Sequence, residues 1–223
     1  MTTPAIKFCG ITRPQDAELA VTLGAWAVGM ILWPRSPRAV APDQAAEIAA
    51  TVGRGAEIVG VFVNPTLQEV GELADTVGLT VVQLHGQEGP AFCAEVARRT
   101  GCRVIKVARV RTGADIHALT RFRTDYHLLD SHVAGVPGGT GETFAWDLGA
   151  DYRRLVPHRR GAAAVPMILS GGLRPGNVGA AIAAVQPFAV DVASGVERSP
   201  GIKDHGQMRE FVAAVADGVA LSA

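Results

Sequence analysis

The chain has no excess of charge of either sign and few cysteines. Among its 223 residues, 21 Lys and Arg balance 21 Asp and Glu. Without net charge there is no overall field that would attract nucleic acid or an anionic membrane. The 3 cysteines, Cys9, Cys93 and Cys102, are an odd number and lack C-x-x-C spacing, which indicates a reducing compartment. We therefore expect a cytoplasmic protein without a nucleic-acid partner.

Long hydrophobic runs are also missing. No apolar stretch approaches the roughly 18 residues that cross a bilayer, and the first residues lack the charged-then-apolar pattern of a secretion signal. No linker, low-complexity tract or charge block divides the chain, and 48% of the residues are hydrophobic. The sequence therefore predicts one sizeable domain over residues 1–223, with no membrane segment.

Short apolar segments alternate with amphipathic segments along the chain. Residues 43–52 place apolar side chains at intervals of three and four, which predicts a helix with one buried face formed by Ala45, Ala46, Ile48, Ala49 and Val52. The apolar segments predict strands at Ala5–Cys9, Ala27–Leu32, Ile58–Val63, Thr80–Leu84, Arg103–Val107, Tyr126–Asp130, Pro166–Ser170 and Phe188–Val192. No G-x-G-x-x-G follows the first strand, so a closed (β/α)8 TIM barrel with eight parallel strands is favoured over an open sheet. Residues 112–124 predict a short fifth helix.

The last two predicted strands each end in a turn of small residues. Gly171 and Gly172 follow the seventh strand, and Ser194 and Gly195 follow the eighth. Glycine lets the backbone approach an anion, and a following helix points its first amides at it. Because these loops usually bind phosphate in such barrels, the two turns predict a phosphorylated small-molecule ligand.

Ionisable residues also lie at or near the ends of several predicted strands, where a barrel carries its chemistry. Cys9 ends the first strand, His85 follows the fourth, Asp130 ends the sixth, and Asp191 lies near the end of the eighth. A group in an apolar barrel mouth is open to a pKa shift, as a general acid or base requires. Cys9 and Asp130 are therefore the candidate acid–base pair.

Several motifs occur together in one order. They are K-F-C-G-I-T from Lys7, G-V-F-V-N from Gly60, V-Q-L-H-G from Val82, L-D-S from Leu129, G-G-T-G from Gly138, F-A-W from Phe144, L-S-G-G-L from Leu169 and D-V-A-S-G-V-E from Asp191. From residue 5 to about residue 205 the chain resembles the phosphoribosylanthranilate isomerases of tryptophan biosynthesis. It departs from their pattern at Phe8, Trp33 and Ala193. These differences bear on how the substrate fits the pocket more than on the type of reaction.

The resemblance implies an Amadori rearrangement of N-(5-phosphoribosyl)anthranilate to 1-(2-carboxyphenylamino)-1-deoxyribulose 5-phosphate. It implies that Asp130 is the acid that opens the ribose ring and Cys9 the base that removes the proton from ribose carbon 2. It assigns Arg38 to the anthranilate carboxylate, with Arg35 as the local competitor. It also implies that neither a metal nor a redox cofactor takes part.

Supporting roles are expected for Lys7, His85 and Asp191. In a closed barrel the first and eighth strands are neighbours, so Lys7 and Asp191 are predicted to form a buried ion pair with a structural role. His85 is predicted to position groups rather than transfer protons, and Trp33 is a candidate wall of the anthranilate pocket. The glycine-rich segment Gly135–Gly141 is a candidate lid.

Other interpretations stay open at this point. One is a different phosphosugar enzyme, such as an epimerase, which would place metal-binding histidines at several strand ends. Another is a two-substrate isomerase that also acts in histidine biosynthesis, for which an aspartate is expected where Cys9 stands. The third is a non-catalytic barrel that binds phosphorylated metabolites. We expect a monomer, with a homodimer as the alternative.

Overall fold

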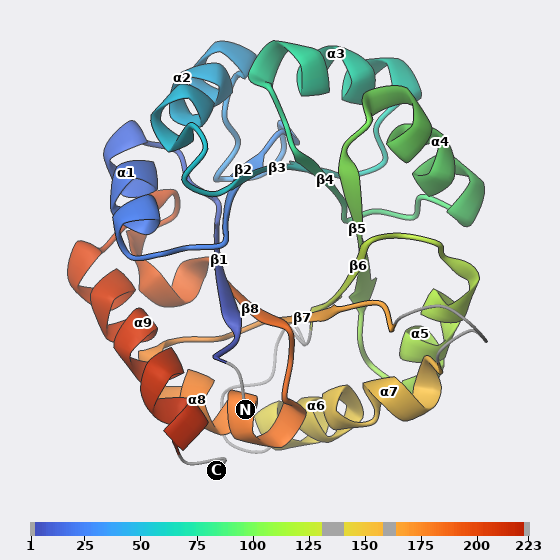
Figure 1. Cartoon of the computed structure of the whole chain (residues 1–223), viewed down its shortest axis with the longest axis vertical. Helices are drawn as coiled ribbons and strands as arrows, with labels where there is room; N and C mark the ends of the chain where they lie inside the picture. Colours follow the sequence, from blue (N-terminus) through green and yellow to red (C-terminus); the bar gives the residue numbers. More distant parts are fainter. Residues whose placement is uncertain (1–2, 131–140, 158–163, 221–223) are drawn as a thin grey trace.

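The computed structural model describes residues 3–130, 141–157 and 164–220, and its centre is a closed barrel of parallel strands (Figure 1). The strands are β1 (Ala5–Cys9), β2 (Ala27–Ile31), β3 (Glu57–Phe62), β4 (Val81–Leu84), β5 (Arg103–Arg109), β6 (Tyr126–Asp130), β7 (Met167–Ser170) and β8 (Ala189–Val192). Each pairs in parallel with the next, and β1 closes the ring against β8. The predicted (β/α)8 barrel is confirmed, with strand ends displaced by at most two residues.

Helices surround this barrel (Figure 1). They are α1 (Pro14–Thr22), α2 (Pro42–Val52), α3 (Leu67–Val77), α4 (Pro90–Thr100), α5 (Gly113–His117), α6 (Gly141–Ala150), α7 (Tyr152–Leu155), α8 (Pro175–Val185) and α9 (His205–Ala220). Helices α1, α2, α4 and α8 begin at a proline, whose fixed φ suits the first helical position. The short fifth helix is confirmed, and the 3-10 turn Ala118–Arg121 follows it. Within the described ranges, no helix has the length and apolarity to cross a membrane.

Helix α2 shows how the apolar periodicity is used. Ala45, Ile48, Ala49 and Val52 are buried against the barrel, as predicted. Ala46 is only half-buried, since one position beyond Ala45 turns about 100° away from the centre of the buried face. The prediction for this helix is therefore confirmed except at the edge of its apolar stripe.

Between β8 and α9 the chain forms a short hairpin over one side of the barrel mouth. It begins with the 3-10 turn Ser194–Val196 and contains the antiparallel strands β9 (Glu197–Ser199) and β10 (Ile202–Lys203). The backbone N–H of Asp204 donates to Val196 O, and Thr12 Oγ1 donates to Gly201 O. The hairpin is thereby fixed next to the loop that follows β1.

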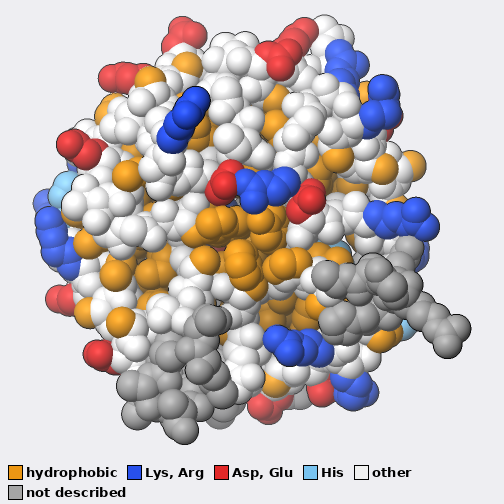
Figure 2. Space-filling model, viewed as in Figure 1, with side chains coloured by type: hydrophobic (Ala, Val, Ile, Leu, Met, Phe, Trp, Pro, Cys, Tyr) orange, Lys and Arg blue, Asp and Glu red, His pale blue; other side chains and the backbone are white. Residues whose placement is uncertain are grey.

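The two ends of the barrel differ in chemistry. At the end where the strands begin, the rings of Trp26, Tyr126 and Phe188 contact one another and close the interior. Figure 2 views this end and shows hydrophobic side chains gathered at its centre; Phe188 is 41% exposed. Farther along the strands, the buried polar side chains of Lys7, Gln83 and Asp191 interrupt the apolar interior. The polar groups needed for chemistry thus lie away from the aromatic end.

Candidate active site

The end of β1 carries two of the predicted site residues on its inner side. A Cβ atom at Gly29 of β2 would lie 3.0 Å from Lys7 Nζ and 3.1 Å from Cys9 Sγ. Glycine therefore leaves the space that these two side chains occupy, and both are buried there. Residues two apart in a strand point to the same face, as Lys7 and Cys9 do here.

Lys7 and Asp191 pair across the seam where the first and last strands meet. Lys7 Nζ lies 2.7 Å from Asp191 Oδ1, and Ser170 Oγ donates to Asp191 Oδ2 at 2.9 Å. Burial alone would lower the pKa of Lys7, but the negative charge of Asp191 and its hydrogen bond to Lys7 oppose burial, and the pKa of Lys7 is raised. The predicted buried ion pair is confirmed, and its cation lies beside the candidate base.

Cys9 lies in an environment that favours the neutral thiol. Burial raises the pKa of the Cys9 thiol above its ordinary value, and the ammonium of Lys7 is the main opposing influence. Near neutral pH the unliganded site therefore holds the thiol. A substrate cation forming beside Cys9 would add to the effect of Lys7 and favour the thiolate.

Asp130, at the end of β6, faces His85, which follows β4. Asp130 Oδ2 lies 3.4 Å from His85 Nε2, and Gln83 Nε2 lies 3.4 Å from His85 Nδ1. The imidazole of His85 therefore lies between the Gln83 amide and the Asp130 carboxylate. Gln83 contacts one ring nitrogen and thereby helps to orient the other toward the candidate acid.

A buried ion pair anchors the loop that carries His85. Lys106 Nζ lies 2.6 Å from Glu88 Oε2 and donates to Gly86 O at 2.8 Å. The Glu88 carboxylate accepts from the backbone N–H groups of Gly86 and Asn64. These bonds fix the loop on both sides and so hold His85 toward Asp130, in keeping with the positioning role expected for His85.

Arg38 reaches the end of β1 from the loop after β2. Its side chain passes over Gly10, where a Cβ atom would lie 2.7 Å from Arg38 Cδ. Gly10 also has φ of +70°, a conformation that favours glycine. The guanidinium Nε and Nη2 donate to the Glu197 carboxylate at 2.9 and 2.7 Å. Arg35, its competitor in the same loop, is exposed, whereas Arg38 is half-buried and bound to Glu197.

Lys203 lies buried on the other side of Glu197. Its Nζ is 2.9 Å from Glu197 Oε1 and donates to the carbonyl oxygens of Cys9 at 2.6 Å and Ala193 at 3.0 Å. Burial lowers the pKa of Lys203, with the Glu197 carboxylate opposing the shift. One ammonium thus connects the ends of β1 and β8 to the carboxylate that holds Arg38.

Sequence reasoning gave Glu197 and Lys203 no role. Glu197 closes one of the quoted motifs, yet its partner Arg38 lies 159 residues earlier in the chain. The Cys9 carbonyl lies 194 residues before Lys203. For Glu197 the available signal was a carboxylate at the end of the motif D-V-A-S-G-V-E, which indicates a charge held by the fold but does not identify its partner. Lys203 lies in none of the quoted motifs.

The turns after β7 and β8 lie against each other. Gly171 and Gly172 have φ of 93° and 66°, in the region that favours glycine. A Cβ atom at Gly195 would lie 1.8 Å from Leu173 O, so the second turn approaches the first only because residue 195 is glycine. The two turns are therefore adjacent at the barrel mouth. Binding of phosphate by Gly171, Gly172, Ser194 and Gly195 stays a prediction.

A hollow of about 460 Å³ lies between the loops that follow β2 and β3. Its lining is mainly apolar and includes Leu32, Trp33, Val40, Phe62 and Val63. Ala39, the residue after Arg38, also lines it. The hollow therefore adjoins the loop that carries Arg38, although Arg38 itself is not among its lining residues.

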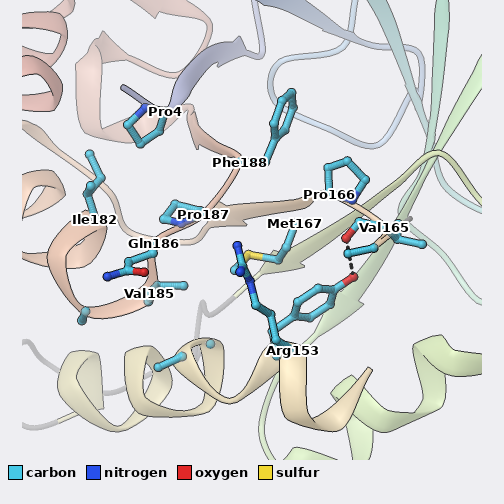
Figure 3. Close-up of a pocket in the computed structure, with 15 residues that line it drawn as sticks. Pro4, Arg153, Val165, Pro166, Met167, Ile182, Val185, Gln186, Pro187 and Phe188 are labelled. Atoms are coloured by element: carbon cyan, nitrogen blue, oxygen red, sulfur yellow. Dashed lines mark hydrogen bonds between the residues drawn. The ribbon is translucent and has the colours of Figure 1, made fainter. Parts of the chain in front are cut away.

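A larger cavity, of about 720 Å³, lies at the opposite end of the barrel (Figure 3). Pro4, Met167 and Phe188, close to the starts of β1, β7 and β8, line it, and Tyr152 Oη donates to Val165 O at its edge. None of the candidate site residues is among its lining residues. We therefore place the candidate active site at the other end.

The predicted lid Gly135–Gly141 lies outside the described residues, except that α6 begins at Gly141.

Comparison with known proteins identifies the family. The family model described as N-(5′-phosphoribosyl)anthranilate (PRA) isomerase matches residues 6–214. The chain belongs to this family. The N-(5′-phosphoribosyl)anthranilate isomerase of Pelobacter propionicus is 45% identical over 208 residues, which cover 93% of each chain. The resemblance found in the motifs is confirmed, and the chain is an isomerase.

Solved structures of PRA isomerases have the same fold. The enzyme from Thermotoga maritima matches with a TM-score of 0.83 and 38% identity, over 96% of this chain and 99% of that one. A PRA isomerase in complex with reduced 1-(o-carboxyphenylamino)-1-deoxyribulose 5-phosphate matches with a TM-score of 0.80 and 35% identity, over the same shares. That relative binds a phosphosugar that carries a carboxyphenyl group.

Proposed function

We propose that this PRA isomerase converts N-(5-phosphoribosyl)anthranilate to 1-(2-carboxyphenylamino)-1-deoxyribulose 5-phosphate in tryptophan biosynthesis, with Cys9 and Asp130 as its acid–base pair. The observation that carries the proposal is the placement of both groups at one barrel mouth. Cys9 ends β1 on the inner side, and Asp130 ends β6, which is joined to β1 through β7 and β8. The same mouth holds Arg38 and the two glycine turns.

The chemistry assigns one proton transfer to each group. Asp130 donates a proton to the furanose ring oxygen as the bond from that oxygen to carbon 1 breaks, which leaves an iminium ion at carbon 1. As the iminium forms, the Cys9 thiol loses its proton to solvent; the resulting thiolate removes the proton from carbon 2, which restores the thiol, and the electron pair of the broken C–H bond neutralises the iminium to give an enolamine. Asp130 regains its proton from solvent before the next turnover. Tautomerisation of the enolamine yields the ketone, and these steps need no redox change.

The raised pKa of Cys9 fits this sequence of steps. A thiol that stays neutral in the empty site is protected from side reactions. The iminium ion forms next to Cys9 and, together with the Lys7 ammonium, favours the thiolate at the moment when the base is needed. Lys7 thus has an electrostatic influence on Cys9 in addition to its structural pairing with Asp191.

The substrate's two anionic ends match two places in the mouth. Arg38 would bind the anthranilate carboxylate, since guanidinium donates two parallel hydrogen bonds to a carboxylate. Trp33 and the hollow beside it would receive the aromatic ring. The phosphate would accept hydrogen bonds from backbone amides at Gly171, Gly172, Ser194 and Gly195.

The direct test is an assay of the purified chain with freshly generated N-(5-phosphoribosyl)anthranilate, whose loss is followed by fluorescence. Consumption well above the spontaneous rate, with the aminoketose as product, is the expected result. A folded protein that leaves the substrate at its spontaneous rate of loss would contradict the proposal.

The partner and location remain parts of the same proposal. A small phosphosugar is the expected partner and the cytoplasm the expected location. The monomer, with the homodimer as its alternative, stays a prediction that light scattering of the purified chain would decide.

A further inference from the structure

Arg38 is held by one edge only. Glu197 Oε1 and Oε2 accept from Nε at 2.9 and 3.0 Å, and Oε2 accepts from Nη2 at 2.7 Å. Among the described residues, no side chain bonds to Nη1 of Arg38. A guanidinium has donors on two usable edges, so the Nη1–Nη2 edge remains to receive a second carboxylate.

Glu197 is itself held in place. Its side chain is only 3% exposed, and Lys203 Nζ lies 2.9 Å from Oε1. Lys203 is fixed in turn by the carbonyl oxygens of Cys9 and Ala193, and its backbone N–H donates to buried Asp16. A carboxylate clamped in this way sets the direction of any side chain that it binds.

We propose that Glu197 is a positioning residue for recognition of the substrate carboxylate: it binds the Nε–Nη2 edge of Arg38 and so presents the other edge to the anthranilate group. Lys203 holds Glu197 in this position. The inference rests on the proposed function, and specifically on Arg38 as the carboxylate-binding residue.

Holding Arg38 on Glu197 lowers the entropic cost of binding the substrate carboxylate. A free arginine side chain loses conformational entropy when it is fixed on a ligand, whereas Arg38 is already fixed on Glu197 and packed over Gly10. Glu197 also neutralises Arg38 in the empty site, while Lys203 leaves the cluster of Arg38, Glu197 and Lys203 with one excess positive charge for the incoming carboxylate. Removing the charge of Glu197 should therefore weaken recognition of the carboxylate more than binding of the rest of the substrate.

A purely structural role for the Arg38–Glu197 pair predicts something different. If the pair only fastened the β9–β10 hairpin to the barrel, its loss would weaken binding of every ligand alike or lower stability alone. The two roles are distinguished by comparing ligands that differ only in the ring carboxylate.

The experiment measures Kd by calorimetry for two unreactive probes, the reduced 1-(o-carboxyphenylamino)-1-deoxyribulose 5-phosphate and its counterpart with a plain phenyl ring. The readout is the preference for the carboxylated probe. In Glu197→Gln we expect that preference to fall by about tenfold or more, the worth of a charge-assisted hydrogen bond, with the Kd of the phenyl probe unchanged. Glu57→Gln, which alters an Arg–Glu pair at the other end of the barrel, should keep the wild-type preference.

The variant Arg38→Ala tests the proposed role of Arg38 separately from the inference about Glu197. Its preference should vanish, and Arg38→Ala combined with Glu197→Gln should lose no more, because both substitutions act through one group. A preference retained in Arg38→Ala would overturn the proposed role of Arg38 itself. A preference lost in Arg38→Ala but kept in Glu197→Gln, or an equal loss for both probes in Glu197→Gln, would overturn only the inference about Glu197. If Glu197→Gln does not fold, Glu197→Asp provides the same test, since its shorter stem withdraws from Arg38.

Discussion

Lys7 Nζ lies 2.7 Å from Asp191 Oδ1, on the pair of strands that closes the barrel. Both side chains are almost fully removed from water, and Ser170 holds the second carboxylate oxygen. A buried charge without its partner is costly, because the surroundings cannot replace the hydration that it lost. The closure of the ring and the charge beside Cys9 thus depend on the same ion pair.

Breaking this pair should therefore destabilise the fold. We expect Lys7→Met, which leaves Asp191 unpaired, to lower the free energy of unfolding by about 3 to 5 kcal/mol in urea titrations. Combining Lys7→Met with Asp191→Leu should recover part of the loss, because no buried charge remains. The matched control Glu95→Gln removes an exposed pair with Arg98 and should leave stability unchanged. A Lys7→Met protein as stable as the wild type would contradict a structural role.

The thiol of Cys9 should titrate above the ordinary range for cysteine. Its pKa is raised by burial and held down by Lys7, so replacing Lys7 with Met should raise that pKa further. The difference in thiolate absorbance between wild type and Cys9→Ser isolates Cys9 from Cys93 and Cys102. A Cys9 thiolate that forms below the ordinary thiol pKa in the empty enzyme would be inconsistent with the geometry.

His127 should make the fold sensitive to acid. Its Nδ1 contacts Tyr152 Oη at 2.7 Å, and Nε2 is buried without a hydrogen-bond partner among the described residues. Burial lowers the pKa of His127 from 6.5 to about 4. Between these two pH values His127 is therefore protonated in the unfolded chain and neutral in the folded protein. The contribution of neutral His127 to the free energy of unfolding is complete above pH 6.5. It should be lost progressively as the pH falls toward 4, by about 3 kcal/mol in all.

Urea titrations across this pH range measure that loss. The variant His127→Gln should show a flatter pH dependence than the wild type, whereas His117→Gln, at an exposed position, should not. If His127→Gln retains the full acid sensitivity, another group is responsible for it.

Gly195 should control the phosphate end of the site. In Gly195→Ala the new Cβ meets Leu173 O, so the turns after β7 and β8 must separate. We expect at least about a tenfold loss of affinity for inorganic phosphate, measured by competition in the isomerase assay. Gly176→Ala introduces a Cβ into open space on α8 and serves as the control. A folded Gly195→Ala variant with the same phosphate affinity as the wild type would contradict the placement of the phosphate site at these turns.

The local patterns were enough to predict the strands, the short fifth helix and the Lys7–Asp191 pair. The strands follow from apolar patterning, the short fifth helix from Gly113 and the polar residues around it, and the ion pair from the rule that the first and last strands of a barrel are neighbours. The side-chain network around Glu197 and Lys203 was not predictable in this way. Its contacts join a loop, a hairpin and two strand ends that are distant in sequence, and no periodic pattern relates them. The environment of Cys9 likewise depended on Gly29, whose missing side chain makes room on a neighbouring strand.

The most direct test of the central claim is the single-turnover conversion of N-(5-phosphoribosyl)anthranilate by wild type, Cys9→Ser and Asp130→Asn at equal, saturating enzyme concentration. Saturation removes differences in binding, and circular dichroism checks the fold. We predict rapid turnover by the wild type and a loss of at least about a hundredfold in each variant, as expected when a general acid or base is removed. Turnover near the wild-type rate in either folded variant would contradict the assignment of Cys9 and Asp130 as the acid–base pair.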